Sequence, residues 1–206
     1  MYRFSPWSYR VRLLVVSCFL SQIVPLLGSG DGNMEDILLE EKITPGILDK
    51  IPIYIAEINY DNVTLATFGN VIPKKYYKKH PESVEWMPDC HLYYTIIFTD
   101  IDANPKWPRR ERQLWIVGNI LGGAWNSGEN ITEYGILEPA ESSGKHRVLV
   151  VIYEQGNKID FKEPVITKRD DERRDNFSTL EFVRKYNMDH PNAANYFSIK
   201  YEGRIK

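Results

Sequence analysis

The sequence predicts one mainly β domain, an antiparallel β-sandwich with short peripheral helices. Three observations lead to this fold class: several short runs are rich in β-branched and aromatic residues, clusters of Gly, Pro and Asn separate those runs, and strands do not alternate with long helices. The chain has 206 residues, of which 43% are hydrophobic and 26% are charged. This length and composition are sufficient for one sizeable core and show no sign of bulk disorder.

Residues 1–30 are expected to be a secretory signal peptide. The stretch contains no Asp or Glu, carries three arginines, and then runs through an apolar block at 13–20 to small residues at 28–30. Polar residues and Pro25 interrupt the apolar block, which therefore falls short of the roughly 20 residues that span a bilayer. We expect a secreted protein with no stable membrane anchor and a single domain over residues 31–206. A mitochondrial presequence is the alternative, but the compact apolar block fits an amphipathic presequence poorly.

Three glycosylation motifs support secretion, whereas the cysteine content argues neither for it nor against it. Asn62, Asn130 and Asn176 each begin an Asn-X-Ser/Thr sequon without proline, so all three are candidate glycosylation sites. Removal of the signal peptide takes Cys18 away, which leaves Cys90 alone and rules out an intrachain disulfide in the mature chain. Cys90 is expected to be a small buried hydrophobe, not a reactive thiol.

The expected elements follow one another along residues 34–201. Residues 34–41 predict a helix of one or two turns, and residues 51–58 alternate in the manner of a half-buried strand. Strands buried on both faces are then expected at 93–99, 114–120 and 148–153, where β-branched, aromatic and other apolar residues predominate.

A second helix is expected at 180–186, with Ser178 or Thr179 as its N-cap and Glu181 placed for a capping box. The run at 168–175 mixes acidic and basic residues and is expected to be a solvated loop before that helix.

Composition and motifs argue against several classes of function. The formal net charge is -2, and the basic residues are interspersed with acids, so nucleic-acid binding is not expected. The sequence lacks the common hydrolase, nucleotide-binding and zinc-protease motifs, and its four histidines have no metal-ligand spacing. We therefore expect no catalytic residues, no metal and no cofactor.

Polar residues at the ends of two buried strands form the candidate site. Asp100 and Asp102 follow one apolar strand, and His146 and Arg147 begin another. Such groups can converge on a small-ligand pocket, where a carboxylate would hold the histidine in one tautomer or in its charged form. The alternative is that the acids cap turns and that the arginine fixes loop geometry, and the residue types alone favour this alternative.

At these residues the sequence resembles the phosphatidylethanolamine-binding protein (Raf kinase inhibitor protein) family. Residues 94–103 (YTIIFTDIDA) are similar to its "YTLxxTDPDAP" signature, and residues 115–120 (WIVGNI) are similar to its "WLVxNI" strand. Residues 144–147 (GKHR) and 153–155 (YEQ) resemble its "GxHRYxxxxYEQ" block. The similarity extends from about residue 43 to about residue 201, with the blocks in order. It implies two packed antiparallel sheets with Greek-key connections and one anion pocket that takes a phosphate or phospholipid headgroup.

The resemblance also implies that this pocket has been altered. Asp100, Asp102 and His146 match family positions, with Arg147 beside them. Asn104 stands where the family has a proline, Leu114 replaces the second pocket histidine, and Val148 replaces the aromatic residue after His-Arg. The family's "GPP" loop reads Glu138-Pro139-Ala140, which brings an acid near the rim. Loss of charge-capable donors weakens binding of a phosphate group, at ~1.5 to 3 kcal/mol for each donor.

Three functional hypotheses follow. The first is a secreted binding protein for a phospholipid or a small hydrophobic ligand with a degenerate anion pocket. The second is an extracellular interaction protein, a protease inhibitor or signalling modulator with a protein partner, which would use Trp107, Trp125 and the loop at 109–112 as exposed contacts. The third is a mitochondrial ribosome-associated relative.

Overall fold

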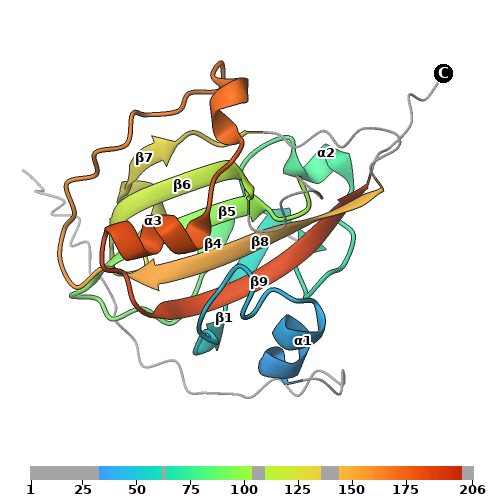
Figure 1. Ribbon diagram of the computed structural model, residues 1–206, viewed down its shortest axis with the longest axis horizontal. Coiled ribbons are helices and arrows are strands. Elements are labelled where there is room, and N and C mark those ends of the chain that lie inside the picture. The colour runs from blue at the N-terminus through green and yellow to red at the C-terminus, as the bar shows by residue number, and fades with distance from the viewer. Residues whose placement is uncertain (1–32, 62–63, 104–109, 136–143, 201–206) are drawn as a thin grey trace, which may run out of the picture. The chain divides into compact units, whose positions relative to one another are not determined.

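Three antiparallel strands, β5 (Tyr93–Asp100), β6 (Arg112–Leu121) and β8 (Lys145–Glu154), form the centre of the fold (Figure 1). β5 lies between the other two and pairs antiparallel with both. Their Val, Ile, Phe and Tyr side chains suit a pleated surface that is covered on both faces. The three runs expected to be strands are therefore confirmed, and the observed strands are longer than the expected ones by between one and four residues.

The computed structural model describes residues 33–61, 64–103, 110–135 and 144–200. The expected signal peptide lies outside the described residues. None of the described helices is long and apolar enough to cross a membrane.

The large sheet has six strands in the order β1-β9-β8-β5-β6-β7. β9 (Pro191–Lys200) pairs antiparallel with β8, and β7 (Glu129–Thr132) pairs antiparallel with β6. β1 (Tyr54–Ile55) runs parallel to β9, so the sheet is mixed and the prediction of wholly antiparallel sheets is wrong at this edge. No hairpin joins these two strands, because most of the chain separates them, and such a long connection allows either direction.

The expected strand at 51–58 is in fact divided between two sheets. β1 belongs to the large sheet, whereas β2 (Glu57–Asp61) pairs antiparallel with β3 (Thr64–Leu65) and β4 (Ser83–Glu85) in a three-stranded sheet. Ala56 lies between them, and its N–H still donates to the Ala194 carbonyl at 3.0 Å. Alternation along the sequence shows that residues are extended, but it does not show which sheet they join.

Apolar clusters cover both faces of the large sheet. One lies between the two sheets and combines Ile58 of β2 and Val84 of β4 with even-numbered residues of β5 and β8, such as Phe98 and Val150. The cluster on the opposite face combines odd-numbered residues of these strands with side chains of α1 (Met34–Glu40), the turn after it and α3 (Thr179–Lys185). Because side chains alternate along a strand, His146 and Arg147 face different clusters.

The two helices expected from the sequence are confirmed. In α3 the N-cap is Ser178, whose hydroxyl accepts from the Glu181 N–H at 3.2 Å. α1 begins after Asn33. Three further short helices were not predicted: α2 (Lys74–Tyr77), η1 (Trp125–Ser127) and η2 (Asp171–Arg174).

Two expectations about burial are wrong. The charged run at 168–175 is not simply a solvated loop, because η2 lies within it and Arg174 is only 1% exposed. Alternating charges in a sequence indicate a polar segment. They do not show whether backbone carbonyl groups will surround one of its guanidinium groups and bury it. Cys90 is exposed, since it lies in the turn region before β5 and not in a strand.

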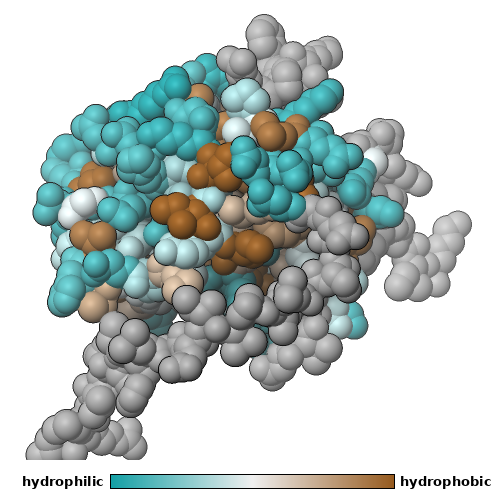
Figure 2. Space-filling model, turned by 90° about the horizontal axis from the view of Figure 1, so that it is seen from below, coloured by the Kyte–Doolittle hydropathy of each residue, from teal (hydrophilic) through white to brown (hydrophobic). Residues whose placement is uncertain are grey.

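Part of the described surface is apolar. Figure 2 shows the molecule from below, that is, from the side on which α1 and β1 are drawn in Figure 1. On this face hydrophobic residues are scattered among hydrophilic ones. The large exposed apolar side chains include Ile53 and Ile55, at 65% and 52% exposure. Ile55 lies on β1, which is an edge strand, and edge strands present unpaired backbone groups as well.

Candidate ligand-binding site

The structure brings Asp100 and His146 together at the paired ends of β5 and β8. His146 Nδ1 lies 2.7 Å from Asp100 Oδ2, and the two residues are 8% and 0% exposed. Asp100 is opposite Val148 in the antiparallel ladder, so His146, two residues earlier, points to the same face. The hydrogen bond to Asp100 raises the pKa of His146 above its ordinary value, against the opposing effect of burial.

Asp102 and Arg147 form a second, separate pair. Arg147 donates from Nε and from Nη2 to the two carboxylate oxygens of Asp102, at 2.8 and 2.6 Å, and its backbone N–H donates to Asp102 as well. Arg147 also donates to the Glu41 carbonyl, at 2.6 Å, at the end of α1. Burial acts to raise the pKa of Asp102, but the bonds from Arg147 outweigh it and the pKa is lowered.

The four candidate residues therefore do not converge on one cavity. Asp100 and His146 face the cluster between the sheets, whereas Arg147 holds Asp102 and α1 on the other side of the large sheet. Asp102 and Arg147 thus fit the alternative in which these residues fix loop geometry. For Asp100 and His146, a role in ligand binding stays a hypothesis. Asp100 also accepts from the Asp102 N–H at 3.0 Å, which connects the two pairs through the turn.

The altered family positions place apolar surface beside this pair. Leu114 and Val148 are 4% and 1% exposed and belong to the cluster between the sheets. A β-bulge in β6 makes Leu114 an extra residue, because Phe98 and Thr99 pair with Trp115 and Gln113 respectively. Asn104 lies outside the described residues.

An aromatic cluster lies further along the same face. Trp115 is the central ring, with centroids of His80, Trp125 and Tyr134 at 5.8, 5.6 and 5.8 Å. The Trp115 indole N–H donates to Asn130 Oδ1 at 3.1 Å. Trp125 was expected to be an exposed contact residue, but it packs into this cluster because η1 turns its side chain back toward β6.

Two adjoining cavities surround the aromatic cluster, with volumes of about 570 and 450 Å³. Both are lined by His80, Tyr134 and Lys168. The larger one extends to Lys78 and the buried Arg174, and the smaller one extends to Trp115 and Trp125. This site was not predicted, because its residues come from segments far apart in the chain and match no local motif.

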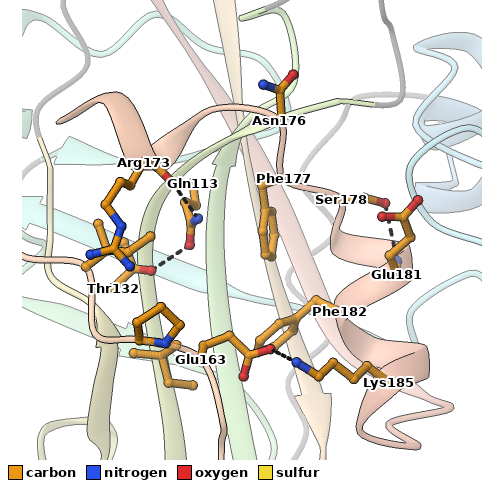
Figure 3. Close-up of a pocket in the computed structure, with 13 residues that line it drawn as sticks. Gln113, Thr132, Glu163, Arg173, Asn176, Phe177, Ser178, Glu181, Phe182 and Lys185 are labelled. Carbon is orange, nitrogen blue, oxygen red and sulfur yellow. Dashed lines mark hydrogen bonds and ion pairs between the residues drawn. The ribbon is translucent and has the colours of Figure 1, made fainter. Parts of the chain in front are cut away.

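A third cavity, of about 360 Å³, lies beside α3 on the other face of the sheet (Figure 3). Gln113, Phe177 and Phe182 are among its lining residues. The charged groups at its rim are paired with one another or with neighbours, for example Glu163 with Lys185 at 2.5 Å. This cavity therefore presents an apolar interior with little net charge.

The expected contact loop at 109–112 is largely occupied by structural bonds where it is described. Arg110 pairs with Glu181 at 2.7 Å, and Arg112 pairs with Asp175 at 2.8 Å and with Asp171. Trp107 and residue 109 lie outside the described residues. The expectation of an open contact surface is therefore wrong for these two arginines, since both already form ion pairs with acids of α3 and of the η2 region.

Glu111, in the same loop, is buried at 2% exposure. It accepts from the hydroxyls of Thr99 and Thr179, both at 2.6 Å, and from the Thr179 N–H at 2.7 Å. Burial raises the pKa of Glu111 to about 7, although the three hydrogen bonds favour the charged form. The carboxyl group thereby joins β5 to the first turn of α3.

The remaining candidate residues lie at the surface. Asn130 and Asn176 are exposed, whereas Asn62 lies outside the described residues. No metal was expected, but one ligand atom from each of Asp89, Cys90 and His91 lies within 4.8 Å of the others. These residues are exposed, and Asp89 accepts from the His91 N–H at 2.8 Å, as in a turn.

The chain was compared with known proteins by sequence and by fold. No family model matches the chain. It is 30% identical over 178 residues to the Drosophila melanogaster protein named "Putative odorant-binding protein A5", which covers 84% of this chain and 82% of that protein. The solution structure of CG7054 is 29% identical, with a TM-score of 0.62 over 78% of this chain and 92% of that chain.

More distant structures share the fold. A carboxypeptidase Y inhibitor, solved with its cognate proteinase, has a TM-score of 0.67 at 16% identity and covers 81% of this chain and 94% of its own. The phosphatidylethanolamine-binding protein of Plasmodium vivax has a TM-score of 0.61 at 14% identity and covers 84% of this chain and 100% of its own. With the motifs around Asp100 and His146 in place, the chain belongs to the phosphatidylethanolamine-binding protein family.

Proposed function

We propose that the chain is a secreted binding protein for a lipid or another small, largely apolar ligand, taken at the Asp100–His146 end of the large sheet. The observation that carries the proposal is the buried pair of Asp100 and His146, 2.7 Å apart. A carboxylate and an imidazolium so close cancel each other's charge, so the pair offers no excess positive charge to a phosphate group. The proposal assigns no catalytic role to the chain.

The neighbours of the pair support a neutral ligand. Leu114 and Val148 are both apolar and buried beside it. Since Asp100 occupies Nδ1 of His146, Nε2 on the other side of the ring is the atom that would meet a ligand. One hydrogen-bond donor among apolar groups suits a long-chain alcohol, ketone or ester better than an anion. The name of the Drosophila relative, which refers to odorant binding, is consistent with a small ligand.

The test follows the imidazole signals of His146 by NMR during titration of the secreted full chain with 1-octanol or with glycerophosphoethanolamine. We expect 1-octanol to shift these signals and to spare those of the exposed His91. Replacement of His146 by alanine should weaken octanol binding about tenfold or more, the value of one hydrogen bond from a charged donor, whereas His91→Ala should leave it unchanged. The proposal fails if octanol leaves the His146 signals in place, or if glycerophosphoethanolamine binds more tightly than octanol.

Secretion is part of the same proposal and has its own test. The intact mass of the protein from the culture medium should show loss of about residues 1–30 and added N-glycans. A mass without glycans on a chain retained in mitochondria would instead support the mitochondrial ribosome-associated relative.

A second candidate function is an extracellular protease inhibitor. It is supported by the fold likeness to the carboxypeptidase Y inhibitor, whose own structure was solved with a proteinase. The direct measurement is the activity of carboxypeptidase Y in the presence of the purified chain. Unchanged proteinase activity at micromolar chain would remove this candidate and leave the ligand-binding proposal untouched.

A further inference from the structure

The larger of the two adjoining cavities contains a buried positive charge without a carboxylate partner. Arg174, at 1% exposure, donates from Nη1 to the carbonyls of Gln113 and Leu114 and from Nη2 to those of Glu133 and Thr167, at 2.9 to 3.4 Å. Among the described residues, no ion pair joins it to an acid. Carbonyl dipoles satisfy its hydrogens but carry no net charge, so the guanidinium remains a source of positive potential beside the cavity.

Lysines increase this potential at the rim. Lys78, Lys79 and Lys168 line the same cavity, and the described part of the chain holds no ion pair to any of them. Two acids also line it, Glu82 and Asp171, and Asp171 shares Arg112 with Asp175.

The acid of the adjoining smaller cavity is Glu133. Its carboxylate accepts from the backbone N–H of Lys168 at 3.0 Å. Taken together, four lysine and arginine residues line the two cavities against three acids, and one of these acids, Asp171, also shares Arg112.

The smaller cavity provides an apolar complement. Trp115, Trp125 and Tyr134 line it, and the His80 ring stacks on Trp115 with a 23° angle between planes. Aromatic faces of this kind bind flat rings or alkyl chains and favour no particular polar group. An apolar recess therefore opens beside a basic one, and His80, Tyr134 and Lys168 line both.

We propose that these adjoining cavities bind a small organic anion, with an aromatic or alkyl body against Trp115 and Trp125 and a carboxylate, sulfonate or phosphate group beside Lys78 and Lys168. The site shares no lining residue with the Asp100–His146 pair and is independent of the function proposed there. The cavity beside α3 provides a contrast, because its rim charges are paired (Figure 3). An anion gains nothing there from excess positive charge.

Two fluorescent probes of similar shape separate the two parts of this proposal. 1-Anilinonaphthalene-8-sulfonate carries a negative charge, and N-phenyl-1-naphthylamine is its uncharged counterpart. Both are titrated into the secreted full chain with its native glycans, because Asn130 lines the smaller cavity. We expect the sulfonate to bind more tightly, with an affinity that falls as salt rises, and inorganic phosphate to displace it poorly because phosphate lacks the apolar body.

Variants then locate the bound anion. The double variant K78Q/K168Q should weaken sulfonate binding about tenfold, at roughly threefold for each exposed lysine, and should change binding of the neutral probe less than twofold. The control K50Q/K162Q removes two lysines outside both cavities and should change neither affinity. His146→Ala should also leave sulfonate binding unchanged, so failure at this site is distinguishable from failure at the first.

Three results would overturn the proposal. They are equal affinity for the two probes, an unchanged sulfonate affinity in K78Q/K168Q, and displacement of the sulfonate by inorganic phosphate at equal concentration. Thermal unfolding of each variant is the control for folding. We expect unchanged unfolding temperatures, since the substituted lysines lie at the cavity rim.

Discussion

Raising the pH from about 4.5 to about 8 should cost the folded protein about 3 kcal/mol through one carboxyl group, that of Glu111. Burial raises its pKa from 4.5 to about 7. Between these two values the folded chain holds a proton that the unfolded chain has released, so the free energy of unfolding falls as the pH rises. The contribution is fully present below pH 4.5 and is lost above pH 7.

Glu111→Gln isolates this group. The amide keeps an oxygen for the Thr179 N–H and cannot ionise, so the variant should lack this part of the pH dependence. We expect the variant to match the wild type within about 1 kcal/mol near pH 4.5 and to be more stable by up to about 3 kcal/mol at pH 8. The measurement is urea unfolding followed by tryptophan fluorescence at half-unit pH intervals.

The difference between the two pH profiles removes the contribution of every other titrating group. Glu57→Gln, on an exposed residue of β2, is the matched control and should leave the profile unchanged. Parallel profiles for the wild type and Glu111→Gln between pH 4.5 and 8 would refute the reasoning. They would mean that Glu111 ionises as easily in the folded chain as in the unfolded one.

Two further predictions concern the candidate site and its surroundings. Because Asp100 raises the pKa of His146, the pair stabilises the fold below pH 6.5, and this stabilisation is lost as the pH rises through the raised pKa. NMR titration should show that the pKa of His146 falls in Asp100→Asn. An unchanged pKa would contradict the pairing. Gly135→Ala should destabilise the fold by about 1 to 3 kcal/mol in urea unfolding, because the new Cβ would lie 2.7 Å from Arg174 Cζ, whereas Gly156→Ala, with nothing within 4 Å, should have little effect.

The central strands could be predicted because their apolar composition indicates that they are buried. β5, β6 and β8 are runs of Val, Ile, Leu and aromatic residues, and a strand covered on both faces needs little else. β9 shows why the prediction was incomplete. Its sequence, PNAANYFSIK, carries two asparagines within a buried strand.

Asn195 explains how such a strand is accommodated. Its side-chain amide donates to the carbonyls of Ala56 and Ala66, at 2.7 and 3.0 Å, and its oxygen accepts from the Phe68 N–H at 3.0 Å. A buried amide is acceptable when its hydrogen bonds are made, and here the partners lie more than a hundred residues away. No local pattern can reveal them.

The candidate site divides in the same way. Asp100 and His146 could be predicted as a pair, because both stand at the ends of apolar strands that were expected to be neighbours. The separation of Arg147 from His146 follows from strand alternation, but only once the boundary of β8 is known. The cavities around His80 depend on tertiary packing alone, since Lys168 and Trp115 become neighbours only in the folded chain.

The position of β9 between β1 and β8 has a consequence for biosynthesis. During synthesis, residues 54–55 emerge long before residues 191–200, yet their partner strand in the large sheet is β9. In the large sheet, β1 therefore has no partner strand until residues 191–200 have been translated. Domains generally fold as units during synthesis, and this one can complete its main sheet only after β9 has left the ribosome.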